Sequence, residues 1–215
     1  MPHKIDPSGN YLPFSGMTVI APVNPAETIW QEIHTILSSN KTLLRYFSLL
    51  PATSYHCTLF SLPDEGMANI ARNWRADIKP LLPALSQLQQ QLTKTPISLT
   101  PSFKHINAAG VLQIIMTVPQ TQADNINQHK ADIYGATRYK ESTERHITLA
   151  YQFKPIKKSH EDSITETLLQ VVKKLEQIED LSLQPAHVCT FKDMTAFTRW
   201  SIPQIPKTSA TSTLV

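Results

Sequence analysis

Short segments in which apolar and polar residues alternate recur along the chain, and most have the length and period of β-strands. Four of them are rich in β-branched or aromatic residues, and we expect strands at 17–23, 55–60, 111–118 and 146–153. Less regular apolar segments predict further strands at 97–103, 181–191 and 195–202. Turns are expected between the paired strands, at Asn107–Gly110 and at Lys192–Asp193. Strands are therefore expected along most of the chain.

Other segments carry apolar residues at helical spacing. The first predicted helix opens at Pro25–Glu27, where a proline and an acidic residue suit the first turn. Residues 67–94 predict two helices divided near Pro80 and Pro83, and further helices are expected at 121–134 and 159–178. Because helices and strands alternate irregularly and neighbouring strands can pair as hairpins, the pattern favours an α+β fold over a doubly wound α/β fold.

The length of 215 residues suits one large domain or two tightly packed lobes. The chain has two roughly matching halves, each with a helix and several strands, which indicates a quasi-repeat. We therefore expect a single bilobal domain at 1–204. Residues 205–215 contain proline, serine and threonine but almost no core-forming pattern, and we expect them to form a disordered tail.

Composition excludes several functional classes. The 5 glycines are all isolated, so the chain has no glycine-rich loop of the kinds that cradle nucleotides. A net charge of +3 is too small for a dedicated nucleic-acid-binding surface. No apolar run approaches the ~18 residues of a membrane span, and the first residues lack the apolar stretch of a secretory signal. We expect a cytoplasmic protein without membrane contacts, with Cys57 and Cys189 as buried free thiols.

Two tripeptides carry the most specific chemistry of the sequence, His56-Cys57-Thr58 and His146-Ile147-Thr148. Roughly 0.8 His-x-Thr motifs are expected by chance in a chain of this composition, so their context decides their weight. Both lie within predicted strands, where alternation places histidine and threonine on one face and the residue between them on an apolar core face. We expect Phe60 and Ala150 to flank the polar face.

Two imidazoles and two hydroxyls around one pocket are suited to the hydrolysis of a phosphodiester. Histidine has an ordinary pKa of ~6.5, so one copy can be neutral and the other protonated at neutral pH. The neutral imidazole takes a proton from water or a ribose hydroxyl, and the imidazolium protonates the departing oxygen. The threonine hydroxyls donate to the phosphate oxygens. Because the chain has no H-E-x-x-H or H-x-E motif, we expect neither a metal nor a cofactor.

The sequence resembles the 2H phosphoesterase superfamily, which includes bacterial RNA 2′,3′-cyclic phosphodiesterases of the LigT type and eukaryotic 2′,5′-phosphodiesterases. The branch that it matches best contains bacterial and fungal proteins without an assigned substrate. The segments that carry the resemblance are Leu12–Ile20, Tyr55–Thr58, Arg145–Tyr151 and Cys189–Phe197. The resemblance implies a bilobal fold in which two antiparallel sheets face each other across a cleft, with helices outside. It also implies metal-independent cleavage of a phosphodiester or cyclic phosphate.

The predicted catalytic residues are therefore His56, Thr58, His146 and Thr148. Which histidine is the acid stays open, since it depends on the direction in which the substrate lies. Further candidates for substrate contacts are Arg145, Tyr55 and Tyr151, although strand alternation turns all three away from the polar face. The predicted protein is a monomer that acts on a small nucleotide or an RNA end. Two alternatives are a non-catalytic nucleotide- or RNA-binding module and a transesterifying or ligating enzyme with the same site.

Overall fold

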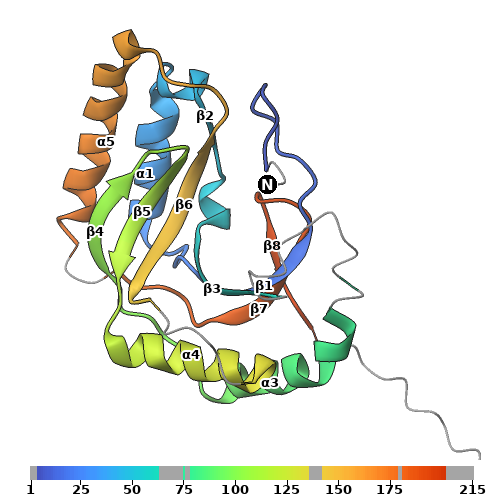
Figure 1. The fold of residues 1–215 in the computed structure, drawn as a ribbon. Coiled ribbons are helices and arrows are strands. Elements are labelled where there is room, and N and C mark those ends of the chain that lie inside the picture. The colour runs from blue at the N-terminus through green and yellow to red at the C-terminus, as the bar shows by residue number, and fades with distance from the viewer. Residues whose placement is uncertain (1–3, 63–74, 76–77, 136–141, 179–180, 202–215) are drawn as a thin grey trace, which may run out of the picture.

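The computed structural model describes residues 4–62, 75, 78–135, 142–178 and 181–201. Over these residues the strands form one antiparallel sheet of 8 strands, in the order β4-β5-β6-β3-β1-β7-β8. Strand β2 pairs with β6 beside this path. Figure 1 shows the helices on the outside of this sheet. The predicted α+β fold is confirmed.

The sheet has two halves that meet between β3 and β6. One half contains β1 (Gly16–Pro22), β3 (His56–Leu62), β7 (His187–Phe191) and β8 (Phe197–Arg199). The other contains β2 (Phe47–Leu49), β4 (Ser102–Asn107), β5 (Val111–Thr117) and β6 (Glu144–Gln152). The pair between Cys57 and Ile147 joins them. The two predicted sheets are therefore continuous through this joint.

Two pairs of helices cover the sheet. Helices α1 (Thr28–Ser39) and α5 (Glu161–Leu175) pack against each other, and α1 also contacts β2 while α5 contacts β4. Helices α3 (Leu82–Lys94) and α4 (Gln120–Tyr134) form the second pair, and α3 contacts β7. Figure 1 shows α1 and α5 beside β4, β5 and β6, with α3 and α4 below β3 and β7. None of the described helices is long and apolar enough to cross a bilayer.

The helices follow from the residues that begin and line them. Helix α5 starts with Glu161 and Asp162 and ends with Lys173 and Lys174, so charges of each sign lie at the end of the helix dipole that they stabilise. Its buried residues recur at intervals of three or four, at Ile164, Thr167, Val171 and Leu175. Helix α1 buries one stripe in the same way, with Trp30, Ile33 and Leu37. These stripes anchor both helices to one half of the sheet.

The two halves repeat one arrangement in which a helix connects two neighbouring antiparallel strands. In the first copy α1, followed by β2, lies between β1 and β3 in the chain, and in the second α4 lies between β5 and β6. Each helix packs away from its own strands, since α1 contacts β2 of the other half and Tyr134 of α4 donates to the Ser61 carbonyl of β3 at 3.3 Å. The second strand of each copy carries a His-x-Thr motif.

Most predicted elements are confirmed, but three predicted strands are shorter than expected. The segment 195–202 forms a strand only at Phe197–Arg199. The segment 97–103 forms a strand only from Ser102, and the segment 181–191 only from His187. Pro101 and Pro185 lie just before these starts, and a proline has no N–H to donate to a sheet. Ile97, Leu99, Leu181 and Leu183 are nevertheless buried. The apolar positions of these segments are therefore buried as their alternation predicts, although the residues do not form the predicted strands. The predicted tail at 205–215 and most of the first helix predicted within 67–94 lie outside the described residues.

Candidate active site

The two His-x-Thr motifs lie beside each other on neighbouring strands. Cys57 and Ile147, the central residues of the two motifs, are directly opposite each other in the antiparallel pairing of β3 with β6. Both are completely buried. Because side chains alternate along a strand, the histidine and threonine of each motif project from the opposite face. The antiparallel direction also brings the histidine of one motif beside the threonine of the other.

His56 is the better enclosed of the two histidines. Its Nδ1–H donates to the Ser54 carbonyl oxygen at 2.7 Å, and its ring lies 4.1 Å from that of Phe197, centroid to centroid. The pKa of His56 is lowered to about 4, mainly by burial; the nearby charges of His146 and Lys4 act in the same direction, and the hydrogen bond to the Ser54 carbonyl opposes them. The ring is therefore neutral at neutral pH, with Nε2 as its proton acceptor.

His146 has a more open environment. It is exposed on β6, and its Cα is paired with that of Ile115 on β5. Thr148, two residues further along, is partly buried, and its Oγ1 accepts a hydrogen bond of 3.5 Å from Gln113 Nε2. Asn107 Nδ2 in turn donates to Gln113 Oε1 at 3.2 Å. Because Oγ1 of Thr148 accepts a hydrogen bond from this chain of amides, its own O–H points away from Gln113 and can donate to another group.

A β-bulge follows each motif at the same position. Ile20 of β1 pairs with Thr58, whereas the preceding Val19 pairs with Phe60, so β3 has one extra residue. On β6, Gln113 pairs with Thr148 and Leu112 with Ala150. An extra residue reverses the alternation that follows it. The prediction that Phe60 and Ala150 flank the polar face is therefore wrong, since both are buried in the hydrophobic core.

The second bulge brings Tyr151 to the histidine face. A hydrogen bond from the Thr148 side chain to its hydroxyl partly offsets the effect of burial, which raises the pKa of Tyr151 to about 12. Lys4 Nζ also donates to the Tyr151 hydroxyl, at 3.3 Å. Strict alternation turned Tyr151 away from this face. The structure instead links it to Thr148.

Tyr55 and Arg145 are not brought to this face. Tyr55 precedes β3 and is buried, with 1% of its surface exposed. Arg145 is also buried, and its Nη1 donates to the Leu59 carbonyl oxygen at 3.3 Å. Each residue directly precedes a histidine of the site, so alternation directs its side chain to the core. The structure thus buries both side chains, and their contacts with substrate stay a prediction.

Three aromatic rings extend from His56, one on β8, one on β7 and one in the segment before β1, and the sequence analysis assigned them no role. The Phe197 ring lies beside His56 and 5.2 Å from the Phe191 ring, which stacks on Phe14 with 6.2 Å between centroids. Phe191 and Phe197 are partly exposed. The sequence did contain a signal for these two residues, because Phe191 and Phe197 both occur in the segment Cys189–Phe197, which carries part of the family resemblance.

A model of the 2H phosphodiesterase family, described as a domain of unknown function (DUF1868), matches residues 4–113. This is just over half of the chain and includes the first His-x-Thr motif. The chain belongs to the 2H phosphodiesterase family. The resemblance to the 2H phosphoesterase superfamily is thereby confirmed. The second motif lies beyond the matched residues, and the pairing of β3 with β6 is what brings it beside the first.

Three known proteins are similar to this 2H phosphodiesterase family member. Uncharacterized protein 127L of Invertebrate iridescent virus 6 is 24% identical, over 91% of this chain and 93% of its own. A conserved protein of unknown function from Agrobacterium tumefaciens, ATU0111, shares the fold with a TM-score of 0.69 and 18% identity, over 94% of this chain and 91% of its own. Kluyveromyces marxianus Usb1 is 10% identical, with a TM-score of 0.42, over 86% and 96% of the two chains. That last likeness is too distant to transfer anything to this chain.

The two cysteines of the 2H domain are not activated as nucleophiles. Cys57 and Cys189 are free and buried, as predicted, and burial raises the pKa of each thiol to about 12, so neither is a thiolate at neutral pH. Among the described residues, no group of three or more histidine, cysteine, aspartate or glutamate side chains is placed to hold a metal ion.

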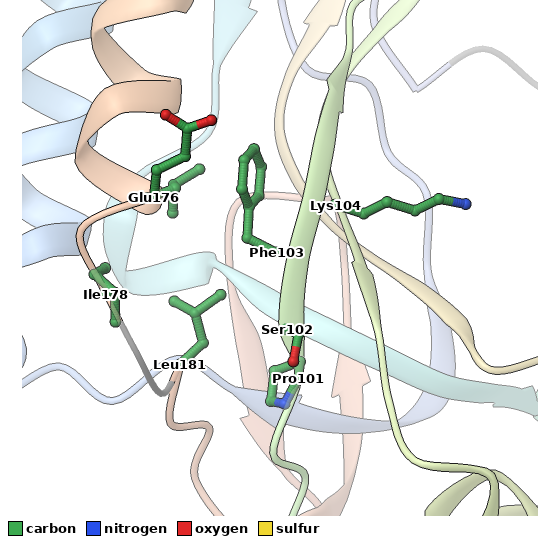
Figure 2. A pocket seen from close by; sticks show the side chains of 8 residues that line it. Pro101, Ser102, Phe103, Lys104, Glu176, Ile178 and Leu181 are labelled. Atoms are coloured by element: carbon green, nitrogen blue, oxygen red, sulfur yellow. The ribbon is translucent and has the colours of Figure 1, made fainter.

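A separate pocket of about 310 Å³ lies between the start of β4 and the end of α5. Figure 2 shows Phe103 pointing into this pocket toward Glu176, whereas Lys104 points to the other side of β4. Leu175, Ile178 and Leu181 are among the apolar residues that line it. The pocket lies on the side of β4 that faces α5 and contains none of the His-x-Thr residues, so it is distinct from the histidine site.

Proposed function

We propose that this protein is a metal-independent phosphodiesterase that uses two histidines as an acid–base pair. Its substrate is a small nucleotide or an RNA-derived phosphodiester, either 2′,3′-cyclic or 2′,5′-linked. The observation that carries the proposal is the pairing of Cys57 with Ile147, which places two imidazoles and two hydroxyls on one face at the joint of the sheet. Membership of the 2H phosphodiesterase family supports the same reaction class.

His56 is the general base in this proposal. Its Nδ1–H is bonded to the Ser54 carbonyl, so the lone pair is on Nε2, and the low pKa of about 4 keeps that nitrogen free of a proton at neutral pH. Nε2 removes a proton from the attacking water or ribose hydroxyl. The oxygen of that nucleophile forms a bond to phosphorus as its proton moves to His56.

His146 is the general acid, because it is the exposed histidine of the pair and can exchange protons with solvent. It gives a proton to the departing oxygen as the bond from that oxygen to phosphorus breaks. Each turnover therefore moves one proton to His56 and one from His146, and exchange with water restores both histidines. The Thr58 hydroxyl donates to one non-bridging oxygen, and the Thr148 hydroxyl turns from Tyr151 to donate to the other, as both oxygens gain charge when phosphorus becomes five-coordinate.

The test is to incubate the purified full chain, with and without EDTA, with a panel of 2′,3′-cyclic nucleotides and 2′,5′-linked dinucleotides and to identify the products. The His146→Asn variant serves as the inactive control. Hydrolysis by the wild type alone supports the proposal. Binding across the panel without any product would identify a binding module, and joined or exchanged products without hydrolysis would identify a ligase-type enzyme. Loss of all activity in EDTA would overturn the metal-independent mechanism.

A further inference from the structure

The N-terminal segment 4–15 connects the two halves of the sheet near the histidine face. It folds back on itself, with Ile5 bridged to Tyr11 and Leu12 N–H bonded to the Lys4 carbonyl at 3.0 Å. At one end Ser48 of β2 donates to the Gly9 carbonyl at 2.6 Å, and at the other Phe14 N–H donates to the Lys192 carbonyl at 2.8 Å. The segment is therefore fixed to both halves.

This arrangement places the ammonium of Lys4 against two aromatic rings. Nζ donates to the Tyr151 hydroxyl at 3.3 Å and lies 5.2 Å from the ring centroids of both Phe14 and Tyr151. No carboxylate of the described residues forms an ion pair with it. Burial lowers the pKa of Lys4, which shows that its positive charge is poorly compensated. A half-buried cation held in this way is poised to bind an anion.

Two observations tie this cation to the site. Tyr151, its hydrogen-bond partner, is also bonded to the Thr148 side chain, and the charge of Lys4 lowers the pKa of His56. A phosphodiester is an anion, and it gains charge in the transition state. Arg145 is turned toward the core and His56 is neutral, so neither supplies a positive charge to the substrate in its resting form.

We propose that Lys4 is an anion-binding residue of the active site, and that its ammonium binds a non-bridging oxygen of the phosphoryl group beside Thr148. Tyr151 is the positioning residue that holds the ammonium there. The identity of the anion as a phosphodiester rests on the proposed function, whereas the binding of a phosphate oxygen by Lys4 does not. The N-terminal segment is then part of the substrate site.

The test measures the binding of inorganic phosphate by calorimetry to four proteins: wild type, Lys4→Met, Lys4→Arg and the control Lys41→Met, in which an exposed lysine is replaced. We expect Lys4→Met to weaken phosphate binding about 10-fold or more, since a charge-assisted hydrogen bond is lost. Lys4→Arg, which keeps the charge, should retain most of the affinity, and Lys41→Met all of it. Equal affinities for all four proteins would overturn the proposal.

A second measurement does not require Lys4→Met to fold. Reductive methylation of the wild-type lysines with ¹³C-formaldehyde keeps their charge, and Lys4→Arg identifies the Lys4 signal by its loss. Phosphate should shift that signal in a saturable manner, while an equal ionic strength of sodium chloride should not. An unchanged signal would overturn the proposal.

The failure of this inference can be distinguished from the failure of the proposed function. If phosphate binds at Lys4 but no member of the nucleotide panel is turned over, the proposed function alone is wrong. If the panel is turned over at a rate that does not depend on Lys4, this inference alone is wrong.

Discussion

Cys57 and Ile147 face each other across the pair that joins the two halves of the sheet, and both side chains are completely buried. Each is the middle residue of a His-x-Thr motif, so their packing fixes the relative position of four polar groups on the opposite face. The same strand pair therefore contributes to the hydrophobic core on one face and positions the candidate site on the other. A rearrangement of this apolar contact would separate the histidine of each motif from the threonine of the other.

Replacement of either histidine by alanine should reduce kcat/KM by ~100-fold or more, because each variant removes one of the two proton transfers. His56→Ala removes the base and His146→Ala the acid. The loss should be read from initial rates on whichever member of the nucleotide panel the wild type hydrolyses. His105→Ala is a suitable control, since His105 is exposed on β4, two strands away from β6.

The double variant His56→Ala/His146→Ala sharpens this prediction. Residues that act as one acid–base unit are not additive, so the double variant should be little worse than either single variant. A single variant that keeps more than about a tenth of the activity would contradict the assignment of that histidine. A comparable loss in His105→Ala would point to a general effect of substitutions in this sheet.

The acid limb of the pH–rate profile should lie far below the ordinary histidine range. His56 must be neutral to act as a base, and its pKa is about 4, so kcat/KM should fall only as the pH decreases through that value. Phe197→Ala should move the limb to higher pH, because removal of the ring 4.1 Å away exposes His56 to water. The measurement is kcat/KM against pH for the two proteins. A wild-type limb near pH 6.5 would contradict the burial of the base.

The faces of the two motifs were predictable because alternation holds through each of them, from His56 to Thr58 and from His146 to Thr148. This alternation of side chains fails at the residue that follows each threonine, where the two β-bulges occur. The consecutive apolar pairs Leu59-Phe60 and Leu149-Ala150 break the period of two, and this break was the available signal for both bulges.

Lys4 could not be found from local pattern. It occurs in a polar, turn-rich segment, and its partner Tyr151 is 147 residues away along the chain. The contact depends on the packing of segment 4–15 against β2 and on the bulge that turns Tyr151 round. Long-range relationships of this kind arise from the tertiary fold, whereas the strands, helices and motifs arise from short-range periods that a single sequence displays.

Tyr151→Phe should raise KM more than it lowers kcat. The variant keeps the ring under Lys4 but removes the hydroxyl that accepts from Nζ and that is bonded to Thr148. Loss of the hydrogen bond that holds the Lys4 ammonium corresponds to a rise in KM of roughly 2- to 10-fold. Tyr46→Phe is the matched control, because its hydroxyl is bonded to His160 at the start of α5. Equal kinetic changes in the two variants would contradict a positioning role for Tyr151.

Gly16→Ala should destabilise the protein through the aromatic rings beside His56. A Cβ at this position would lie 2.6 Å from Cζ of Phe191, whose ring contacts Phe197, which in turn contacts His56. Overpacking of this kind costs about 1 to 3 kcal/mol of the free energy of unfolding, measurable by urea denaturation. Phe191→Leu shortens the side chain and makes room for the methyl group. The double variant Gly16→Ala/Phe191→Leu should therefore be more stable than the sum of the single effects predicts, and strict additivity would show that Phe191 does not transmit the clash.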